Sequence, residues 1–244
     1  MSKTRNLIII PTYNEIENIL IVIDKVLNLP VQFHILVVDD NSPDGTSKLV
    51  KHHIGKGNKN IFLLEREKKE GLGKAYINGF LWALKRDYDF IFEMDADLSH
   101  DPKELIKMHE ELNNSKCDVV VGSRYIDGVN VVNWPLSRII LSYCASIYSR
   151  IITGVPIYDL TSGFVGFNKN VLQNIELSKI LFNGYAFQIE LKFKAYINNY
   201  ILKEIPIIFK DRRYGKSKMN GSIILEAIFG LIKLKFMSYF YKKK

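Results

Sequence analysis

The chain of 244 residues contains little cysteine and shows no secretion signal. Its two cysteines, Cys117 and Cys144, lie in apolar runs without metal-ligand spacing, so we interpret them as structural thiols of a reducing compartment. The start, "MSKTRNLIII", has a short apolar run that ends at "PTYNE", so we expect no signal peptide there. Internal repeats, low-complexity tracts and linkers are also missing from the sequence.

Two common nucleotide-binding motifs are missing as well. In "GLGKAY", Tyr76 stands at the third glycine position of the dinucleotide fingerprint, and the Gly-Lys-Ser/Thr of a Walker A loop does not occur. We interpret "GLG" as a tight turn before a helix. A nucleotide would therefore have to be held by other elements.

The composition is that of a globular protein with an excess of basic over acidic residues. Hydrophobic residues make up 47% and charged residues 25%, which excludes wholesale disorder, and the length allows a substantial core. The net charge of +8 indicates anionic partners, such as nucleic acid, a phosphate-bearing ligand or an anionic membrane surface. Because the sequence holds no nucleic-acid recognition motif, we expect no nucleic-acid partner.

Strands and helices alternate along the sequence. Apolar runs predict strands at Asn6–Ile10, His34–Val38, Ile61–Leu64, Asp89–Met94 and Asp118–Gly122. Helices are predicted between them at Glu15–Leu27, Thr46–His52, Leu72–Lys85 and Pro102–Leu112. This alternation predicts an α/β fold with a doubly wound, mostly parallel sheet and helices on both faces.

Polar clusters follow three of these strands: "PTYNE", "DDNSPDGT" and "DADLSH". In the first, Thr12 and Glu15 have the spacing of a helix capping box. Because the carboxyl ends of parallel strands meet at one edge of a sheet, three such clusters predict a ligand site at that edge.

The stretch "FIFEMDADLSHDPKEL" places Asp95 and Asp97 between a strand and a helix, for which Asp101 is the candidate N-cap. Asp87 and Asp89 have the same spacing but precede the strand, so they fall at its opposite end. Paired carboxylates at the ligand edge suit Mg²⁺ or Mn²⁺ bridging a diphosphate. Asp95 and Asp97 are therefore the candidates for a divalent metal.

Seven motifs occur in a fixed order: "IIIPTYNEIENI", "VVDDNSPDGT", "EMDADLSHDP", "VVGSRY", "DLTSGF", "GYAFQIE" and "DRRYGKSK". From Leu7 to Lys218 the chain thereby resembles family 2 glycosyltransferases, and more narrowly the dolichol-phosphate (polyprenol-phosphate) mannosyltransferases. The resemblance implies a GT-A-type domain that uses Mg²⁺ or Mn²⁺. Such enzymes transfer mannose from GDP-mannose to dolichyl or polyprenyl phosphate.

The resemblance also implies roles for individual residues. Guanosine and its ribose would be held by Pro11, Tyr13, Glu15, Val38 and Asp40. The diphosphate and metal would lie at Asp95, Ala96 and Asp97, with Ser99 standing where some relatives have a glutamine as third metal ligand. Asp39, beside Asp40, is equally consistent with a turn or cap.

Basic residues would meet the phosphates. By the resemblance, Arg124 and Arg138 contact the phosphates of donor and acceptor, and together with Asp97 they form the catalytic set. Arg212 and Lys218 would belong to a mobile loop that closes over the diphosphate. Arginine suits bidentate phosphate contact on chemical grounds. One departure is Val165, where many relatives carry arginine, which leaves open how the acceptor-side wall is made.

A lipid phosphate acceptor simplifies the chemistry. Its second pKa is about 6, so it is anionic near neutral pH and needs no general base. The Gln-x-x-Arg-Trp motif of the processive synthases is absent, since the only tryptophans are Trp82 and Trp134. We therefore expect direct displacement with inversion, from an α-linked donor to a β-linked product.

A polyprenyl acceptor requires contact with a membrane. Residues Trp134–Gly154 read as an amphipathic helix, with Arg138, Ser142, Ser146, Ser149 and Thr153 on one side and Ile139, Ile140, Tyr143 and Ile147 on the other. The segment "SIILEAIFGLIKLKFMSYFYKKK" resembles an interfacial helix with a basic anchor. We expect a catalytic domain over residues 1–220 and a membrane-associating segment over 221–244. The alternative is a helix packed on the domain or on a partner.

These features predict a peripheral protein on the cytoplasmic face of a membrane, either a bacterial plasma membrane or the endoplasmic reticulum. The participation of a membrane subunit stays open. A donor such as UDP-glucose is an alternative to GDP-mannose, because Asp40 and Tyr13 alone do not separate guanine from uracil. A non-catalytic nucleotide-sugar-binding membrane adaptor is disfavoured, because the acidic pair and the basic loop are both intact.

Overall fold

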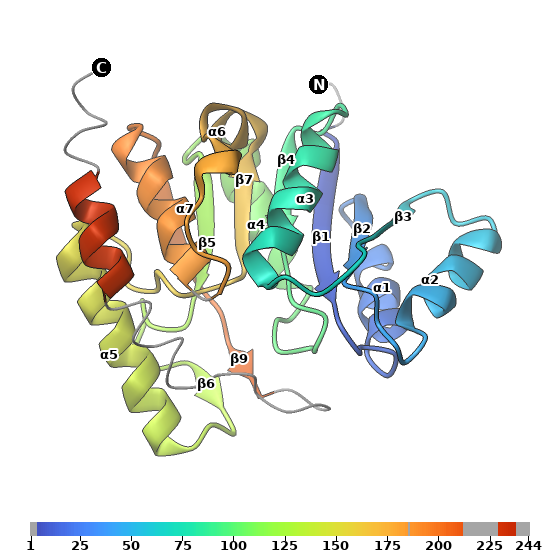
Figure 1. The fold of residues 1–244 in the computed structure, drawn as a ribbon, viewed down its shortest axis with the longest axis horizontal. Helices are drawn as coiled ribbons and strands as arrows, with labels where there is room; N and C mark the ends of the chain where they lie inside the picture. The colour runs from blue at the N-terminus through green and yellow to red at the C-terminus, as the bar shows by residue number, and fades with distance from the viewer. Residues whose placement is uncertain (1–3, 185, 212–228, 238–244) are drawn as a thin grey trace.

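The computed structural model describes residues 4–184, 186–211 and 229–237. The predicted loop residues Arg212 and Lys218 lie outside these ranges, as does most of the predicted membrane segment. Among the described residues, seven strands form one sheet in the order β3-β2-β1-β4-β7-β5-β8 (Figure 1). They are β1 (Asn6–Thr12), β2 (Phe33–Asp39), β3 (Ile61–Glu65), β4 (Phe90–Glu93), β5 (Val119–Ser123), β7 (Val165–Asn168) and β8 (Leu202–Pro206).

The sheet is mostly parallel. Among the seven strands that the described residues form in this sheet, only β7 runs antiparallel. It is antiparallel to both of its neighbours, β4 and β5. The short strands β6 (Val131–Val132) and β9 (Phe209–Lys210) form a separate parallel pair. The predicted doubly wound, mostly parallel α/β fold is thereby confirmed.

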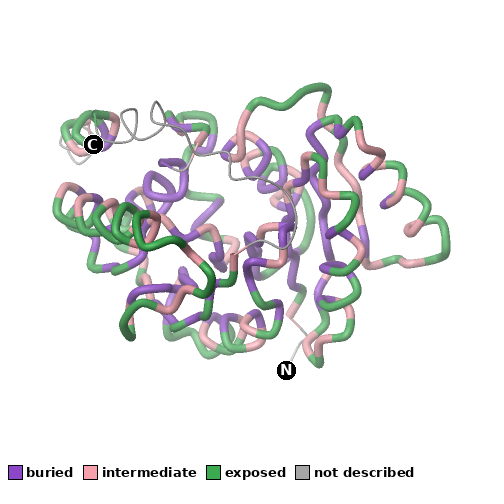
Figure 2. Tube along the Cα trace, turned by 90° about the horizontal axis from the view of Figure 1, so that it is seen from below, coloured by how far each residue is buried: buried purple, intermediate pink, exposed green. Residues whose placement is uncertain are grey.

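Helices cover both faces of the sheet because the strand side chains alternate between two apolar clusters. In β1, Leu7 and Ile9 belong to one cluster and Ile8 and Ile10 to the other. The first cluster is closed by α3 (Leu72–Leu84), α6 (Lys169–Asn174) and α7 (Ala186–Ile197). The second is closed by α1 (Ile19–Leu27), α2 (Thr46–Gly55) and α4 (Glu104–Asn113). Figure 2 shows the buried residues in the middle of the molecule and exposed ones along the outer helices.

The predicted start of the first helix is wrong. The Thr12 hydroxyl donates to Asp39 Oδ1 at 2.8 Å, so it does not cap a helix. Asn14 has a left-handed backbone with a φ of 60°, and the Glu15 carbonyl closes a turn with the N–H groups of Asn18 and Ile19. Helix α1 therefore begins at Ile19. A tertiary partner for Thr12 has replaced the local capping box.

The fourth helix also begins later than predicted. The carboxylate of Asp101 accepts a hydrogen bond from the Lys103 N–H at 3.0 Å, which fixes a turn, and α4 starts at Glu104. Asp101 thus stabilises the turn that leads into the helix.

The long helix α5 (Leu136–Thr153) contacts the helical segment 229–237 (drawn red in Figure 1). Leu231 and Leu234 of that segment are buried in the first apolar cluster. Lys235 Nζ donates to the Thr153 carbonyl at 2.9 Å, at the carboxyl end of α5. This part of the C-terminal segment therefore packs on the domain. Within the described ranges, no helix combines the length and apolar character needed to cross a membrane.

Gly79 in α3 allows close packing of that helix on β1. A Cβ placed there would lie 2.7 Å from Ile9 Cγ2, a fully buried side chain. We expect Gly79→Ala to lower the free energy of unfolding by about 1–3 kcal/mol through overpacking. Gly55→Ala is the matched control, because Gly55 is also helical and its Cβ would meet nothing within 4 Å. That change should raise stability by up to about 1 kcal/mol. Urea denaturation measures both, and equal effects would contradict the packing argument.

Candidate active site

The predicted site residues within the described ranges lie at or near the carboxyl edge of the parallel strands. Thr12 at the end of β1 is paired in register with Asp39 at the end of β2. Because β7 runs in the opposite direction, its beginning reaches the same edge, where Val165 pairs with Glu93 of β4 and Val121 of β5. Asp89, at the opposite edge, accepts a hydrogen bond from the Arg5 N–H at 2.8 Å. The assignment of the two Asp-x-Asp pairs to opposite ends of β4 is thus confirmed.

Asp39 has a structural role. Its fully buried carboxylate accepts hydrogen bonds from the Thr12 hydroxyl and from the hydroxyl and N–H of Ser42, at 2.6–2.9 Å. The Ser42 hydroxyl in turn accepts the Asn14 N–H at 3.0 Å. Asp39 thereby ties the loops after β1 and β2 into one rigid edge, which agrees with its interpretation as a turn residue.

Asp40 is held by an arginine, Arg66, whose role the sequence alone does not indicate. Arg66, directly after β3, approaches Asp40 Oδ1 at 2.5 Å and also pairs with Glu70 at 2.9 Å. Burial raises the pKa of the Asp40 carboxyl, and Arg66 opposes that rise. Arg66 could have been suspected from its place after a predicted strand, but its partner lies 26 residues away.

The other residues predicted to hold the nucleoside differ in what they can offer. Tyr13 is half-buried, and Lys69 Nζ lies 4.1 Å from the centre of its ring. The Glu15 carboxylate accepts a hydrogen bond from the Asn18 side chain at 2.9 Å. Val38 is fully buried in the core and pairs in register with the half-buried Pro11. A contact from Val38 to a nucleoside would therefore have to come from its backbone.

The acidic loop after β4 has a fixed shape. Leu98 adopts a φ of 63°, and Asp97 Oδ1 accepts the Ser99 N–H at 3.1 Å. The Asp95 N–H donates to His100 Nδ1 at 3.3 Å. Both Ser99 and Ala96 are buried, and the Ala96 side chain packs in the second apolar cluster. The loop thus presents Asp95 and Asp97 at the edge of the sheet.

The buried side chain of His100 supports the acidic loop after β4. Its ring stacks on Phe164 at 4.7 Å and meets the edge of Phe209 at 5.3 Å. Burial lowers the pKa of His100 to about 4, so the ring is neutral at neutral pH and its Nδ1 can accept a hydrogen bond. The sequence alone does not indicate this role, because it depends on two aromatic residues far away in the sequence.

The donor set of this loop fits a hard divalent cation that shares ligands with a diphosphate. Among the described residues, no group of three His, Cys, Asp or Glu side chains could hold a metal by itself. Two carboxylates from one loop are the usual protein contribution for Mg²⁺ bound together with phosphates. The acidic residues act on the neighbouring Tyr76. Burial raises the pKa of its hydroxyl, and the carboxyl groups of Asp95, Glu93 and Asp97 raise it further. A cation would relieve this repulsion.

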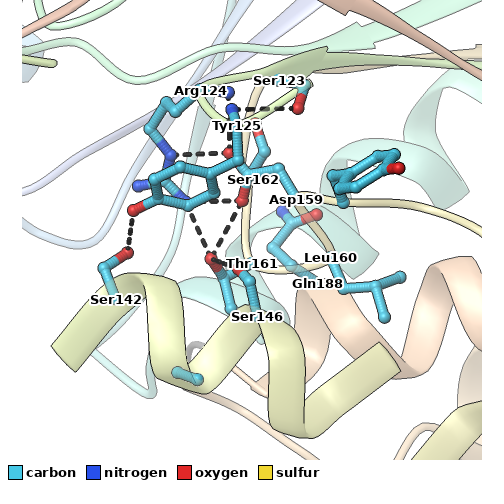
Figure 3. A network of polar contacts seen from close by, with 12 residues as sticks. Ser123, Arg124, Tyr125, Ser142, Ser146, Asp159, Leu160, Thr161, Ser162 and Gln188 are labelled. Carbon is cyan, nitrogen blue, oxygen red and sulfur yellow. Dashed lines mark hydrogen bonds and ion pairs between the residues drawn. The ribbon is translucent and has the colours of Figure 1, made fainter. Parts of the chain in front are cut away.

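Arg124, after β5, is held by a buried carboxylate (Figure 3). Its Nε and one terminal nitrogen donate to the two oxygens of Asp159 at 2.7 Å each, and that terminal nitrogen also donates to the Thr161 hydroxyl. The N–H of Asp159 donates to Glu204 of β8 at 2.8 Å. Burial alone would raise the pKa of Asp159, but Arg124 outweighs it and the pKa is lowered. Arg124 is therefore fixed by the segment before β7, which β8 holds in turn.

Arg138, in the first turn of α5, is brought close to Arg124. Its guanidinium lies 3.9 Å from the centre of the Trp134 ring, and that of Arg124 lies 5.6 Å from the same ring. Arg138 also pairs with Asp211 at 2.8 Å. The structure thus brings the two predicted phosphate ligands together around one indole ring, and it assembles a cationic region beside the acidic loop.

Comparison with known proteins gives consistent matches. A family model described as glycosyl transferase family 2 matches residues 7–176. Polyprenol monophosphomannose synthase of Mycolicibacterium smegmatis is 44% identical over 225 residues, covering 92% of this chain and 84% of that protein. Undecaprenyl-phosphate mannosyltransferase of Micrococcus luteus is 40% identical over 224 residues, covering 92% of this chain and 91% of that protein.

A solved structure shares the fold. The mannosyltransferase from Pyrobaculum calidifontis, in complex with GDP-Man and Mn²⁺, has a TM-score of 0.65 at 14% identity. The match covers 100% of this chain and 66% of that one. At this identity the likeness concerns the fold, and it agrees with the predicted GT-A type.

The buried Arg124–Asp159 pair should dominate the stability of the site. Asp159→Asn leaves the arginine buried without its countercharge, and we expect a loss of about 3–5 kcal/mol in unfolding free energy at neutral pH. Asp211→Asn removes the partly exposed partner of Arg138 and should cost less than about 1 kcal/mol. Chemical denaturation distinguishes the two, and equal losses would contradict this ranking.

The same pair predicts a pH dependence. The pKa of Asp159 is lower in the folded protein than its unfolded value of about 3.9, so its contribution is present above that pH. It is lost as the pH falls further, through the folded pKa. The difference in unfolding free energy between the wild type and Asp159→Asn should therefore shrink below about pH 4. A difference that stays constant down to pH 2 would contradict the assignment.

Proposed function

Because the chain belongs to glycosyl transferase family 2, we propose that it transfers mannose from GDP-mannose to a polyprenyl or dolichyl phosphate, with inversion at the anomeric carbon. The relatives that are 40% and 44% identical are named for mannosyl transfer to, or synthesis of, polyprenyl-phosphate compounds. The observation that carries the proposal is the pairing of two oppositely charged subsites at one edge of the sheet. Asp95 and Asp97 form the acidic subsite, and Arg124 and Arg138 the cationic one.

The acidic subsite suits the donor. Asp95 and Asp97 would hold Mg²⁺ or Mn²⁺, which when bound neutralises the diphosphate and makes it a better leaving group. Asp40, fixed by Arg66, lies two strands away at the end of β2, where it would accept hydrogen bonds from the nucleoside. Tyr13 at the end of β1 would pack against the same nucleoside.

The cationic subsite suits a phosphate acceptor. Arg124 is already immobilised by Asp159 and Thr161, so little entropy is lost when it binds an anion. Arg138 adds a second positive charge beside the same Trp134 ring. A phosphate monoester with a second pKa of about 6 is already a nucleophile at neutral pH. These residues therefore need only orient and neutralise it against the anomeric carbon.

The protein surface beside the cationic subsite suits a lipid. On α5, the polar side predicted from the sequence faces inward: Ser146 is 1% exposed, and Ser142 accepts a hydrogen bond from the Tyr125 hydroxyl at 2.7 Å. The outer side is apolar, with Ile151 at 74% exposed. This is the reverse of the usual amphipathic helix of a soluble domain.

We define the α5 apolar surface as the exposed side chains of Leu136, Ile140, Leu141, Tyr143, Ile147 and Ile151. The segment 229–237 extends it with the exposed Phe229, Ile232 and Phe236. The exposed cations Arg150 and Lys233 lie on the same two helices. An apolar surface edged by cations suits an anionic bilayer, from which the acceptor would reach the cationic subsite. That the bilayer is met from its cytoplasmic face stays a prediction.

A transfer assay tests the catalytic proposal. Purified protein is incubated with short polyprenyl phosphate in detergent and labelled GDP-mannose or UDP-glucose, with and without Mg²⁺ or Mn²⁺. We expect label in the lipid only from GDP-mannose and only with metal. Asp97→Ala should lower the rate at least about 100-fold, because the charge of the leaving group is then poorly neutralised. Asp87→Ala, an acidic residue at the opposite edge, is the control.

The outcomes of this assay separate the alternatives. Transfer from UDP-glucose would keep the mechanism and change the donor, whereas no transfer from either would favour a non-catalytic nucleotide-sugar-binding protein or a missing membrane subunit. NMR coupling of the product should show a β linkage. An α-linked product would contradict direct displacement.

Vesicle flotation tests the membrane proposal. The wild type should float with vesicles that contain anionic lipid, and less so at high salt. Ile147→Glu with Ile151→Glu places two charges on the α5 apolar surface and should reduce the bound fraction several-fold. Leu81→Glu, at a residue on α3 that is 46% exposed, should leave binding unchanged. An unbound wild type at low salt, or an equal loss in both variants, would contradict the proposal.

A further inference from the structure

The motif "GYAFQIE" has no role in the function described so far, yet its glutamine lies beside both subsites. Gln188 is in the first turn of α7 and is only 2% exposed. Figure 3 shows its side chain near Leu160 and Asp159, the segment that leads from the arginine site to β7. A buried amide needs partners for its oxygen and for its NH₂ group.

Lys192 fixes the orientation of this amide. Its fully buried Nζ donates to four oxygens: the carbonyls of Leu160, Ser162 and Gln188, and Gln188 Oε1 at 3.2 Å. Burial lowers the pKa of Lys192 to about 8, which leaves it protonated at neutral pH. An ammonium group only donates, so the amide atom facing it is the oxygen. The NH₂ group of Gln188 is therefore turned away from Lys192.

The NH₂ group meets no acceptor with the distance and angles of a full hydrogen bond among the described residues. A Cβ built on Gly163 would lie 3.9 Å from Gln188 Nε2 and 4.0 Å from Asp95 Oδ1, so the missing side chain of Gly163 leaves a space between these two atoms. Gly163 and Asp95, which border this space, are both partly exposed. Glu93 also lies near the amide: burial raises the pKa of its carboxyl to about 8, and Lys192 and then the Gln188 side chain oppose that rise. An NH₂ group carries two hydrogens, so an interaction with Glu93 leaves one of them for a ligand in this space.

The space beside Gly163 lies between the two charged subsites. The segment from Asp159 to Gly163 contacts Arg124 through Asp159 and Thr161 at one end and reaches Asp95 at the other. In a direct displacement the anomeric carbon lies between the incoming phosphate and the leaving diphosphate. The sugar of the donor therefore belongs in this space.

We propose that Gln188 Nε2 donates a hydrogen bond to a hydroxyl group of the donor sugar beside Gly163, and so helps to select the sugar that is transferred. The proposal rests on the function proposed above and deepens it. A buried donor aimed at a substrate hydroxyl discriminates strongly, because a sugar that lacks the hydroxyl leaves the donor unpaired. Lys192 acts as a positioning residue, since it holds both the amide and the segment from Leu160 to Ser162.

The test pairs changes in the enzyme with changes in the donor. The kcat/KM for transfer to polyprenyl phosphate is measured with GDP-mannose and with its four monodeoxy analogues, for the wild type and for Gln188→Met. We expect the wild type to disfavour one analogue by about 5- to 150-fold. Gln188→Met should lose a similar factor on GDP-mannose and no longer disfavour that analogue, because the two changes remove the same contact.

Controls separate this contact from a structural effect. Gln173→Met, at an exposed glutamine of α6, should leave all five values unchanged. Thermal melting checks that Gln188→Met is folded. If Gln188→Met lowers kcat/KM by the same factor for every donor, the glutamine is only structural and the proposal is wrong. If the wild type transfers no mannose at all, the proposed function fails, and this inference fails with it.

Gly163→Ala provides a second, independent variant. The added methyl group makes only ordinary contacts with Gln188 and Asp95, so the protein should fold normally. It occupies the space assigned to the sugar, so we expect a tenfold or larger drop in kcat/KM for GDP-mannose, while the affinity for GDP measured by calorimetry stays within about twofold. An unchanged kcat/KM would overturn the placement of the sugar. A parallel loss of GDP affinity would also contradict it.

Discussion

The buried ion pair between Arg124 and Asp159 organises the elements around the cationic subsite. It joins the end of β5 to the segment before β7, and Glu204 on β8 holds the same segment through two backbone N–H groups. Arg124 also donates to the Thr161 hydroxyl, whose oxygen lies 3.4 Å from the hydroxyl oxygen of Ser146 in α5. Because a buried charge is tolerated only with its partner, these elements can adopt this arrangement only together.

The reversed strand β7 makes the adjacency of the two subsites possible. In a fully parallel sheet the beginning of each strand lies at the edge away from the ligand. Here the residues that precede β7 reach the ligand edge, and they carry Asp159, Thr161 and Gly163 between the acidic loop and Arg124. Gly166 lets β7 fit between its neighbours, because a Cβ there would lie 2.7 Å from the Phe92 ring. The short distance between the acidic and the cationic subsite thus follows from the reversed direction of β7.

The sequence predicted the parts of the site that depend on local order along the chain. Asp95 and Asp97 were distinguished from Asp87 and Asp89 because strand direction can be inferred from the pattern. Asp159, Arg66 and Lys192 were missed, since each acts through a partner that only the tertiary fold brings near. The capping box at Thr12 failed for the same reason, because Asp39 offers that hydroxyl a buried partner 27 residues away. The face of α5 that turns inward also depended on contacts with Tyr125 and Thr161.

The proposed binding of α5 to a bilayer has a kinetic consequence. A protein held in the plane of a bilayer meets lipid-anchored molecules by lateral diffusion, at an effective concentration set by the thin layer that both occupy. Arg124 and Arg138, as the proposed ligands of the acceptor phosphate, then need to provide only a modest intrinsic affinity for the headgroup. Weak headgroup binding also favours release of the charged product. The hydrocarbon chain can remain in the lipid throughout, so one site can serve isoprenoid chains of different lengths.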